Sequence, residues 1–114
     1  MAQLRIQHLQ LGAYGTNAYV VTCTTTGKTV LVDTPGQPAD ILAALGGVIP
    51  EYILITHGHM DHLEALAGVK EATKAPVAVN AGDAGRLPFN PDRLLEDGDT
   101  VQVGQVSLRV IHTP

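Results

Sequence analysis

The sequence is poor in cysteine, in aromatic residues and in positive charge. Its 114 residues contain one cysteine, no tryptophan, and seven lysine or arginine residues against eleven acidic ones, which gives a formal net charge of −4. A single cysteine excludes an intramolecular disulfide and is typical of the reducing cytoplasm, so we expect Cys23 to be a small buried residue of a strand. The acidic balance disfavours a nucleic-acid partner, because phosphate binding needs a basic surface.

Long apolar runs are also missing. No stretch approaches the roughly 20 apolar residues of a membrane-spanning helix, and the amino terminus lacks the basic and apolar segments of a signal peptide. We therefore expect a cytoplasmic protein with no membrane partner. The apolar fraction of 45% is still sufficient for a packed core, and the length fits one domain or part of one.

Histidine, in contrast, is concentrated in one short stretch. Four residues of metal-ligand type lie within six positions: His57, His59, Asp61 and His62. The apolar run 52–55 precedes them and the amphipathic stretch 63–69 follows, which indicates a strand, a loop and a helix. Open α/β sheets usually place their chemistry at the carboxyl ends of strands. Imidazole and carboxylate are ligands that zinc, iron and manganese accept.

The spacing of these four residues favours a metal site. His57 and His59 are two apart, so an extended backbone points both side chains to the same side, and Gly58 allows a tight turn between them. Asp61 and His62 are adjacent and diverge, so they suit a second metal beside the first. The alternative is a polar loop whose histidines cap the next helix, but this density of ligand-type residues is more typical of a metal site.

The pattern His57-x-His59-x-Asp61-His62 resembles the signature of the metallo-β-lactamase-fold hydrolases. Weaker resemblance covers residues 15–21, 31–36 and 111–114. The resemblance implies an α/β fold, half of an αβ/βα sandwich, with a mixed and mostly antiparallel sheet and helices on one face. The family's next ligand histidine follows a Thr-Pro pair, and this chain ends at such a pair. The resemblance therefore implies that residues 1–114 form the N-terminal half of such a domain.

The resemblance also implies roles for individual residues. One or two metal ions, zinc or else iron or manganese, would be bound by His57, His59, Asp61 and His62. Asp61 would in addition act in catalysis by orienting the hydroxide. Asp33 resembles a position beneath the ligands that accepts hydrogen bonds and fixes the ligand loop, although a turn-initiating aspartate fits equally well. Tyr14 is a weaker candidate for substrate contact, and the substrate-binding residues stay unidentified.

The complete domain would then be a metal-dependent hydrolase of thioesters or esters, glyoxalase II-like, acting on a small-molecule substrate through a metal-bound hydroxide. A lactonase, a nuclease and an iron-dependent persulfide dioxygenase are alternatives on the same scaffold. A third alternative is an inactive half-domain that self-assembles. Two ligands per metal are fewer than the three that a zinc site needs, and an exposed inner sheet face would drive association with a second copy or a second half-domain.

Hydrophobic periodicity and turn residues predict the remaining elements. We expect a helix that begins at Pro38 and ends at Gly46-Gly47, and a helix after His62 that buries Leu63, Leu66, Ala67 and Val69. One helical turn is expected within 80–87 and an irregular segment at 88–92. Strands are expected at 4–11, with an irregularity near His8, at 17–22, 29–32, 52–55 and 76–79, and as a hairpin over 101–110 with a type II′ turn at Gly104-Gln105.

Overall fold

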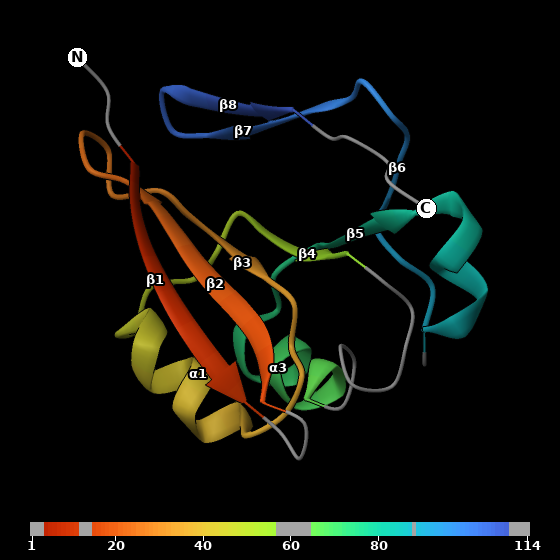
Figure 1. Cartoon of the computed structure of the whole chain (residues 1–114), viewed down its shortest axis with the longest axis horizontal. Coiled ribbons are helices and arrows are strands. Elements are labelled where there is room, and N and C mark those ends of the chain that lie inside the picture. The colour runs from red at the N-terminus through yellow and green to blue at the C-terminus, as the bar shows by residue number, and fades with distance from the viewer. Residues whose placement is uncertain (1–3, 12–14, 57–64, 88, 110–114) are drawn as a thin grey trace.

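The computed structural model describes residues 4–11, 15–56, 65–87 and 89–109. Its main element is a six-stranded sheet in which the strands follow the order of the chain (Figure 1). These strands are β1 (Leu4–Leu11), β2 (Thr16–Cys23), β3 (Thr29–Val32), β4 (Tyr52–Ile55), β5 (Val77–Asn80) and β6 (Arg93–Leu95). The sheet is mixed, as predicted.

The sheet divides into an antiparallel part and a parallel part. β1, β2 and β3 are antiparallel neighbours, whereas β3 to β6 are joined by three parallel pairings. The helices α1 (Pro38–Leu45) and α3 (Leu66–Thr73) lie in the connections from β3 to β4 and from β4 to β5. Each helix carries the chain back to the end of the sheet at which the previous strand began, so the next strand runs parallel to it.

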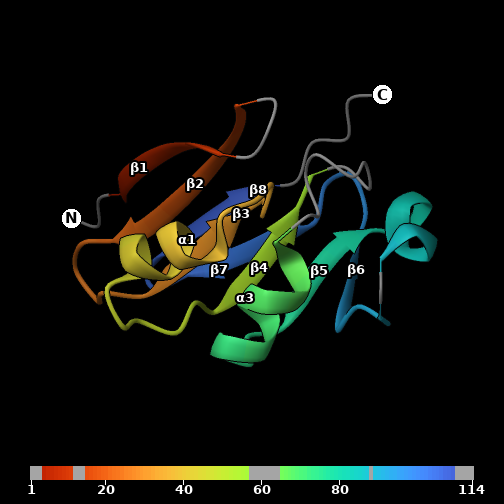
Figure 2. The same cartoon turned by 90° about the horizontal axis from the view of Figure 1, so that it is seen from below.

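Both helices pack on one face of the sheet, as predicted (Figure 2). Ile41 and Leu45 of α1 and Leu66 and Val69 of α3 are buried in one apolar cluster. That cluster also contains the sheet residues Leu11, Ala18, Val20, Leu31, Ile53, Ile55, Val77 and Val79. The amphipathic pattern of each helix therefore identified the face that packs on the sheet, except that Ala67 is exposed rather than buried.

The opposite face of the sheet is covered by the hairpin of β7 (Thr100–Val103) and β8 (Val106–Arg109) (Figure 1). Val101 and Val103 are fully buried there, together with Cys23, Val30 and Ala78 of the six-stranded sheet. The expectation of an exposed inner face is therefore wrong for the part that this hairpin covers. The burial of Cys23 in β2 confirms its prediction as a small core residue.

The predicted irregularity near His8 is also wrong. β1 pairs with β2 in one unbroken register from Leu4↔Cys23 to Leu11↔Thr16. The apolar pattern changes phase because the two ends of β1 bury opposite faces. Leu4 packs on the hairpin side, whereas Leu9 and Leu11 pack against the helix side.

Local turn chemistry agrees with the structure elsewhere. Gly46 caps α1 in the left-handed region, with φ of 61°. Gly104 has φ of +57° at the first loop position of the β7–β8 hairpin, as a type II′ turn requires. A 3₁₀ helix, η1 (Ala81–Arg86), supplies the expected helical turn. No helix in the described ranges is long and apolar enough to cross a membrane.

Candidate metal centre

The predicted ligands His57, His59, Asp61 and His62 lie outside the described residues, as do Tyr14 and Leu63. The structure does describe the residues that flank the ligand segment, Thr56 at the end of β4 and Ala65 before α3. Within the described ranges, no three His, Cys, Asp or Glu side chains come together as a metal site. The structure therefore shows how the chain is held on the two sides of the ligand segment, at Thr56 and at Ala65.

The amino-terminal flank is held by Asp33. Its Oδ1 accepts a hydrogen bond from the backbone N–H of Thr56 at 2.8 Å, and its Oδ2 accepts one from the Thr56 hydroxyl at 2.6 Å. β3 and β4 are parallel neighbours, so the residues that follow them lie at the same edge of the sheet. The carboxylate thus fixes the backbone immediately before His57.

The carboxyl-terminal flank is held by the next residue of the same turn. The backbone N–H of Ala65 donates to the carbonyl oxygen of Thr34 at 2.9 Å. Thr34 is fully buried, and Ala65 is nearly so. Thr56 and Ala65, the residues on either side of segment 57–64, are therefore both hydrogen-bonded to the dipeptide Asp33-Thr34, at the carboxyl end of β3.

Helix α3, which follows the segment, contacts the sheet through Lys70. The Lys70 ammonium of α3 donates to the carbonyl oxygen of Ala75 at 2.6 Å and to the carboxylate of Asp92 at 3.1 Å. The same Asp92 oxygen accepts the backbone N–H of Val77 at 2.7 Å. The Val77 N–H and the Lys70 charge lower the pKa of Asp92. These contacts fix α3 against β5 and β6.

The chemistry of the donor set fits a metal. Three imidazoles and one carboxylate within six residues suit zinc or iron. Sequence reasoning gave no role to Thr56, although it lies directly before the ligands. A hydroxyl and an N–H at the end of a buried strand, facing an aspartate at the end of the neighbouring strand, are the signal that could have identified it.

Comparison with known families places the chain. Residues 11–114 match the Metallo-beta-lactamase superfamily. The chain belongs to this superfamily. The match covers the whole six-stranded sheet except the first seven residues of β1.

A curated relative and two solved structures refine this placement. The hydroxyacylglutathione hydrolase of Rhodospirillum rubrum is 42% identical over 99 residues, which are 84% of this chain and 38% of that protein. TTHA1623 in a di-iron-bound form is 31% identical, with a TM-score of 0.75 over 95% of this chain and 61% of that one. The di-zinc class B3 metallo-beta-lactamase LRA-12, from an Alaskan soil metagenome, is 29% identical, with a TM-score of 0.76 over 96% and 49%.

The family match and the named relatives agree with one another. The chain belongs to the metallo-β-lactamase superfamily and has relatives named hydroxyacylglutathione hydrolase, and its fold implies a metal cofactor. The chain spans less than two fifths of the length of the curated relative. The solved relatives hold two irons in one case and two zincs in the other, so the fold accommodates either metal.

Proposed function

We propose that residues 1–114 are the N-terminal half of a metal-dependent hydrolase of thioesters or esters. The observation that carries the proposal is the anchoring of Thr56 and Ala65, the residues that flank segment 57–64, on Asp33-Thr34. Thr56 and Ala65, which flank the four ligand-type residues in the sequence, are thereby both held at the carboxyl end of β3. The relative from R. rubrum, whose name describes hydrolysis of an acyl–glutathione, supports a small thioester as the substrate.

Each ligand-type residue has a proposed role. His57 and His59 bind one metal, whereas Asp61 and His62 bind a second, with zinc as the leading candidate and iron or manganese as alternatives. When bound, the metals lower the pKa of a coordinated water towards neutrality and so supply hydroxide for attack on the acyl carbon. Asp61 orients that nucleophile and is the proposed catalytic residue. Asp33 holds the segment in place through Thr56.

Metal content and turnover test this proposal together. We expect bound zinc and hydrolysis of an acyl–glutathione thioester, in this chain or in a longer chain that includes it. Replacing His57 and His59 by alanine should remove metal, and Asp61→Asn should reduce turnover by at least 100-fold. His8→Ala is the matched control, because His8 lies on β1 and its Nε2–H donates to Asn17 Oδ1 at 2.7 Å.

Other outcomes would select other functions. Bound iron with oxygen uptake and no thioester hydrolysis would favour the persulfide dioxygenase. Hydrolysis of lactones or nucleic acids in preference to thioesters would favour a lactonase or a nuclease. A folded chain with neither metal nor activity, alone or in the longer chain, would favour the inactive half-domain that self-assembles.

A further inference from the structure

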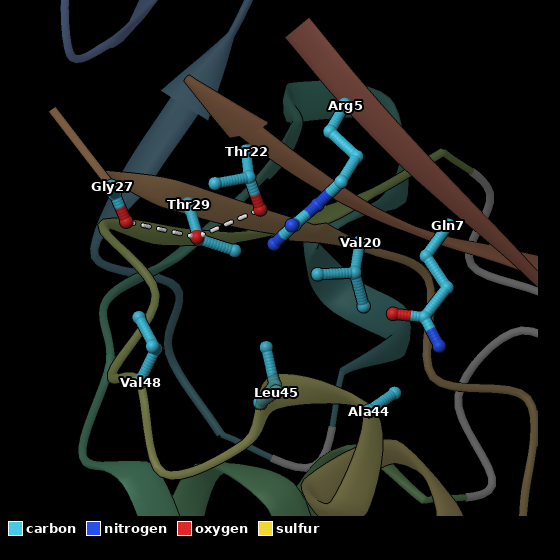
Figure 3. A pocket seen from close by; sticks show the side chains of 9 residues that line it. All are labelled: Arg5, Gln7, Val20, Thr22, Gly27, Thr29, Ala44, Leu45 and Val48. Atoms are coloured by element: carbon cyan, nitrogen blue, oxygen red, sulfur yellow. Dashed lines mark hydrogen bonds between the residues drawn. The ribbon is translucent and has the colours of Figure 1, made fainter. Parts of the chain in front are cut away.

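A cavity lies at the end of the sheet opposite to Asp33 and Thr56. It has a volume of about 180 Å³, is partly open to solvent, and is bordered by β1, β2, the start of β3 and the carboxyl end of α1 with the loop that follows it (Figure 3). Thr29 lines this cavity and begins β3, whereas Asp33 directly follows that strand. Four residues of extended chain, roughly 13 Å, separate the two, so the cavity is distinct from the candidate metal centre.

The lining of the cavity has two chemically different sides. The sheet contributes all the polar side chains, together with the apolar Val20 of β2; the polar ones are Arg5, Gln7, Thr22 and Thr29. The helix side contributes Ala44, Leu45 and Val48, which are apolar. Figure 3 shows the Arg5 and Gln7 side chains extending from β1 towards the apolar residues. A matching ligand therefore has a polar group at one end and a short aliphatic part at the other.

Arg5 carries a charge that the described residues leave uncompensated. Its side chain is exposed to solvent and forms no ion pair or hydrogen bond with another residue of the described ranges. The nearby cation Lys28 differs, because its ammonium is paired with Glu51 at 3.4 Å. A guanidinium presents a planar fork of N–H donors that binds a carboxylate through two parallel hydrogen bonds. The cavity thus selects for an anion, and for a planar one.

The two threonines do not compete with Arg5 for this role. The Thr29 hydroxyl donates to the carbonyl oxygen of Gly27 at 3.3 Å, and the Thr22 and Thr29 hydroxyl oxygens are 3.1 Å apart. Because the Thr29 proton is used on Gly27, Thr22 donates to Thr29. Both hydroxyl protons are therefore occupied, and Arg5 and the Gln7 amide supply the donors for an anion.

We propose that this cavity binds a free short-chain monocarboxylate. The carboxylate lies against Arg5 and Gln7, and the aliphatic part packs on Leu45 and Val48. The cavity volume of about 180 Å³ corresponds to that of about six water molecules, which suits an acid of four or five carbons. The site is independent of the metal centre, so it can be occupied whether or not the proposed hydrolase activity exists.

Titration of butyrate into isotope-labelled protein, with a chelator present to remove metal, tests the proposal by NMR. We expect saturable shifts at Thr22, Thr29, Leu45 and Val48. Arg5→Gln should weaken binding at least tenfold, whereas Arg109→Gln, the same charge change on β8, should leave it unchanged. Ala44→Leu should weaken butyrate more than acetate, because it fills the apolar side.

Several results would overturn the proposal. The first is that butyrate causes no saturable NMR shifts in the folded wild-type protein. The second is that Arg5→Gln binds butyrate as tightly as the wild type. The third is that the shifts are confined to the face of the sheet covered by β7 and β8. Tighter binding of N-acetylglutamate amide than of butyrate would show that a protein side chain, rather than a free acid, is the better ligand. If Arg5→Gln does not fold, Arg5→Lys replaces it as the test. This variant retains the charge without the planar fork, so it should bind butyrate more weakly than the wild type.

Discussion

The carboxylate of Asp33 accepts two hydrogen bonds from one residue, Thr56, which lies 23 positions further along the chain. Asp33 itself is buried and has φ of 66°, in the left-handed region that few residues other than glycine adopt. The surrounding contacts hold this conformation, including the bond from the Asp33 N–H to the carbonyl oxygen of Leu54 at 2.8 Å. Asp33 therefore joins the ends of β3 and β4 through its backbone and its side chain.

Replacing Asp33 by alanine should destabilise the fold by about 2–4 kcal/mol, because the Thr56 N–H loses a charged acceptor in a partly buried site. The loss is measured by urea unfolding. Zinc affinity, measured by chelator competition, should fall about 10- to 100-fold, since the backbone before His57 is released.

Asp33→Asn is the matched control for that change. Asparagine tolerates the left-handed region and retains one acceptor oxygen, so we expect a smaller loss of both stability and metal affinity. Wild-type zinc affinity in a folded Asp33→Ala protein would contradict the role of Asp33 in holding the ligand segment.

Asp92 should contribute to the pH dependence of stability. Folding lowers its pKa through the Val77 N–H and Lys70, so its contribution is complete above the unfolded pKa of about 3.9 and is lost as the pH falls through the folded value. Asp92→Asn should therefore cost about 0.5–1.5 kcal/mol at pH 7, a modest value because the side chain is 47% exposed. Thermal melts between pH 2 and 7 measure the difference.

The wild-type and Asp92→Asn stabilities should converge as the pH falls below about 4. The control is Glu71→Gln, in which the lost carboxylate belongs to an exposed pair with Lys74 at 3.2 Å. That variant should follow the wild-type curve within about 0.5 kcal/mol. A constant difference between Asp92→Asn and wild type down to pH 2 would contradict the assignment.

Gly104 cannot be replaced without local rearrangement. A Cβ at this position would clash with the Thr26 hydroxyl and would lie 2.9 Å from Cys23 Cβ and 3.0 Å from its Sγ. Gly104→Ala should thus cost about 2–4 kcal/mol, the sum of overpacking and of a positive φ. Gly98→Ala is the control, because Gly98 also has positive φ but no atom within 4 Å of the added carbon. It should cost only about 1 kcal/mol.

The same contacts affect Cys23. Hydrogen bonds from the Thr26 hydroxyl and the Gln105 backbone lower the pKa of the Cys23 thiol to about 7. The thiol is nonetheless fully buried, so thiol reagents should modify it only as fast as the hairpin opens. Gly104→Ala should accelerate its labelling by Ellman's reagent, whereas Gly98→Ala should do so much less.

Self-association remains a prediction that gel filtration with light scattering can test. In the described ranges, the exposed large apolar side chains include Ile6 on β1 and Leu94 on β6, the two edge strands of the sheet. Unpaired edges favour pairing with another chain. We expect an oligomer at micromolar concentration that Ile6→Lys shifts towards monomer, whereas Ile49→Lys, in a loop, does not. A clean monomer of the wild-type chain would contradict the prediction.

The sequence predicted most elements because their ends carry explicit signals. Pro38 and Gly46 define α1, and the glycine of the Gly104-Gln105 turn defines the last hairpin. It did not predict β6, whose three residues follow a proline-rich segment and have no strand pattern of their own. β6 forms because β5 offers a parallel edge, and Arg93 also lies over the ring of Tyr52 at 5.6 Å. Such tertiary pairing is not visible in a local pattern.

In the candidate site, too, local features could be predicted from the sequence, whereas features that depend on strand pairing could not. The ligand types and their spacing are local properties of 57–62, so the sequence alone predicts a metal site there. Those residues lie outside the described ranges, and the metal site stays a prediction. The partner of Asp33 depends on the parallel pairing of β3 with β4, which the sequence did not predict. The hydrogen bonds of Asp33 to Thr56 therefore emerged only from the structure.

The hydrogen bonding of Thr56 and Ala65, which flank segment 57–64, to a single dipeptide also has a consequence for hydrogen exchange. The amide protons of Thr56 and Ala65 are bonded to Asp33 and Thr34, which follow a strand inside the sheet. Neither amide can exchange with deuterium through fraying of the segment alone, because exchange requires separation from the end of β3. Both should therefore exchange at the slow rate of the central strands, and so the frame around the ligands should persist until the sheet itself opens.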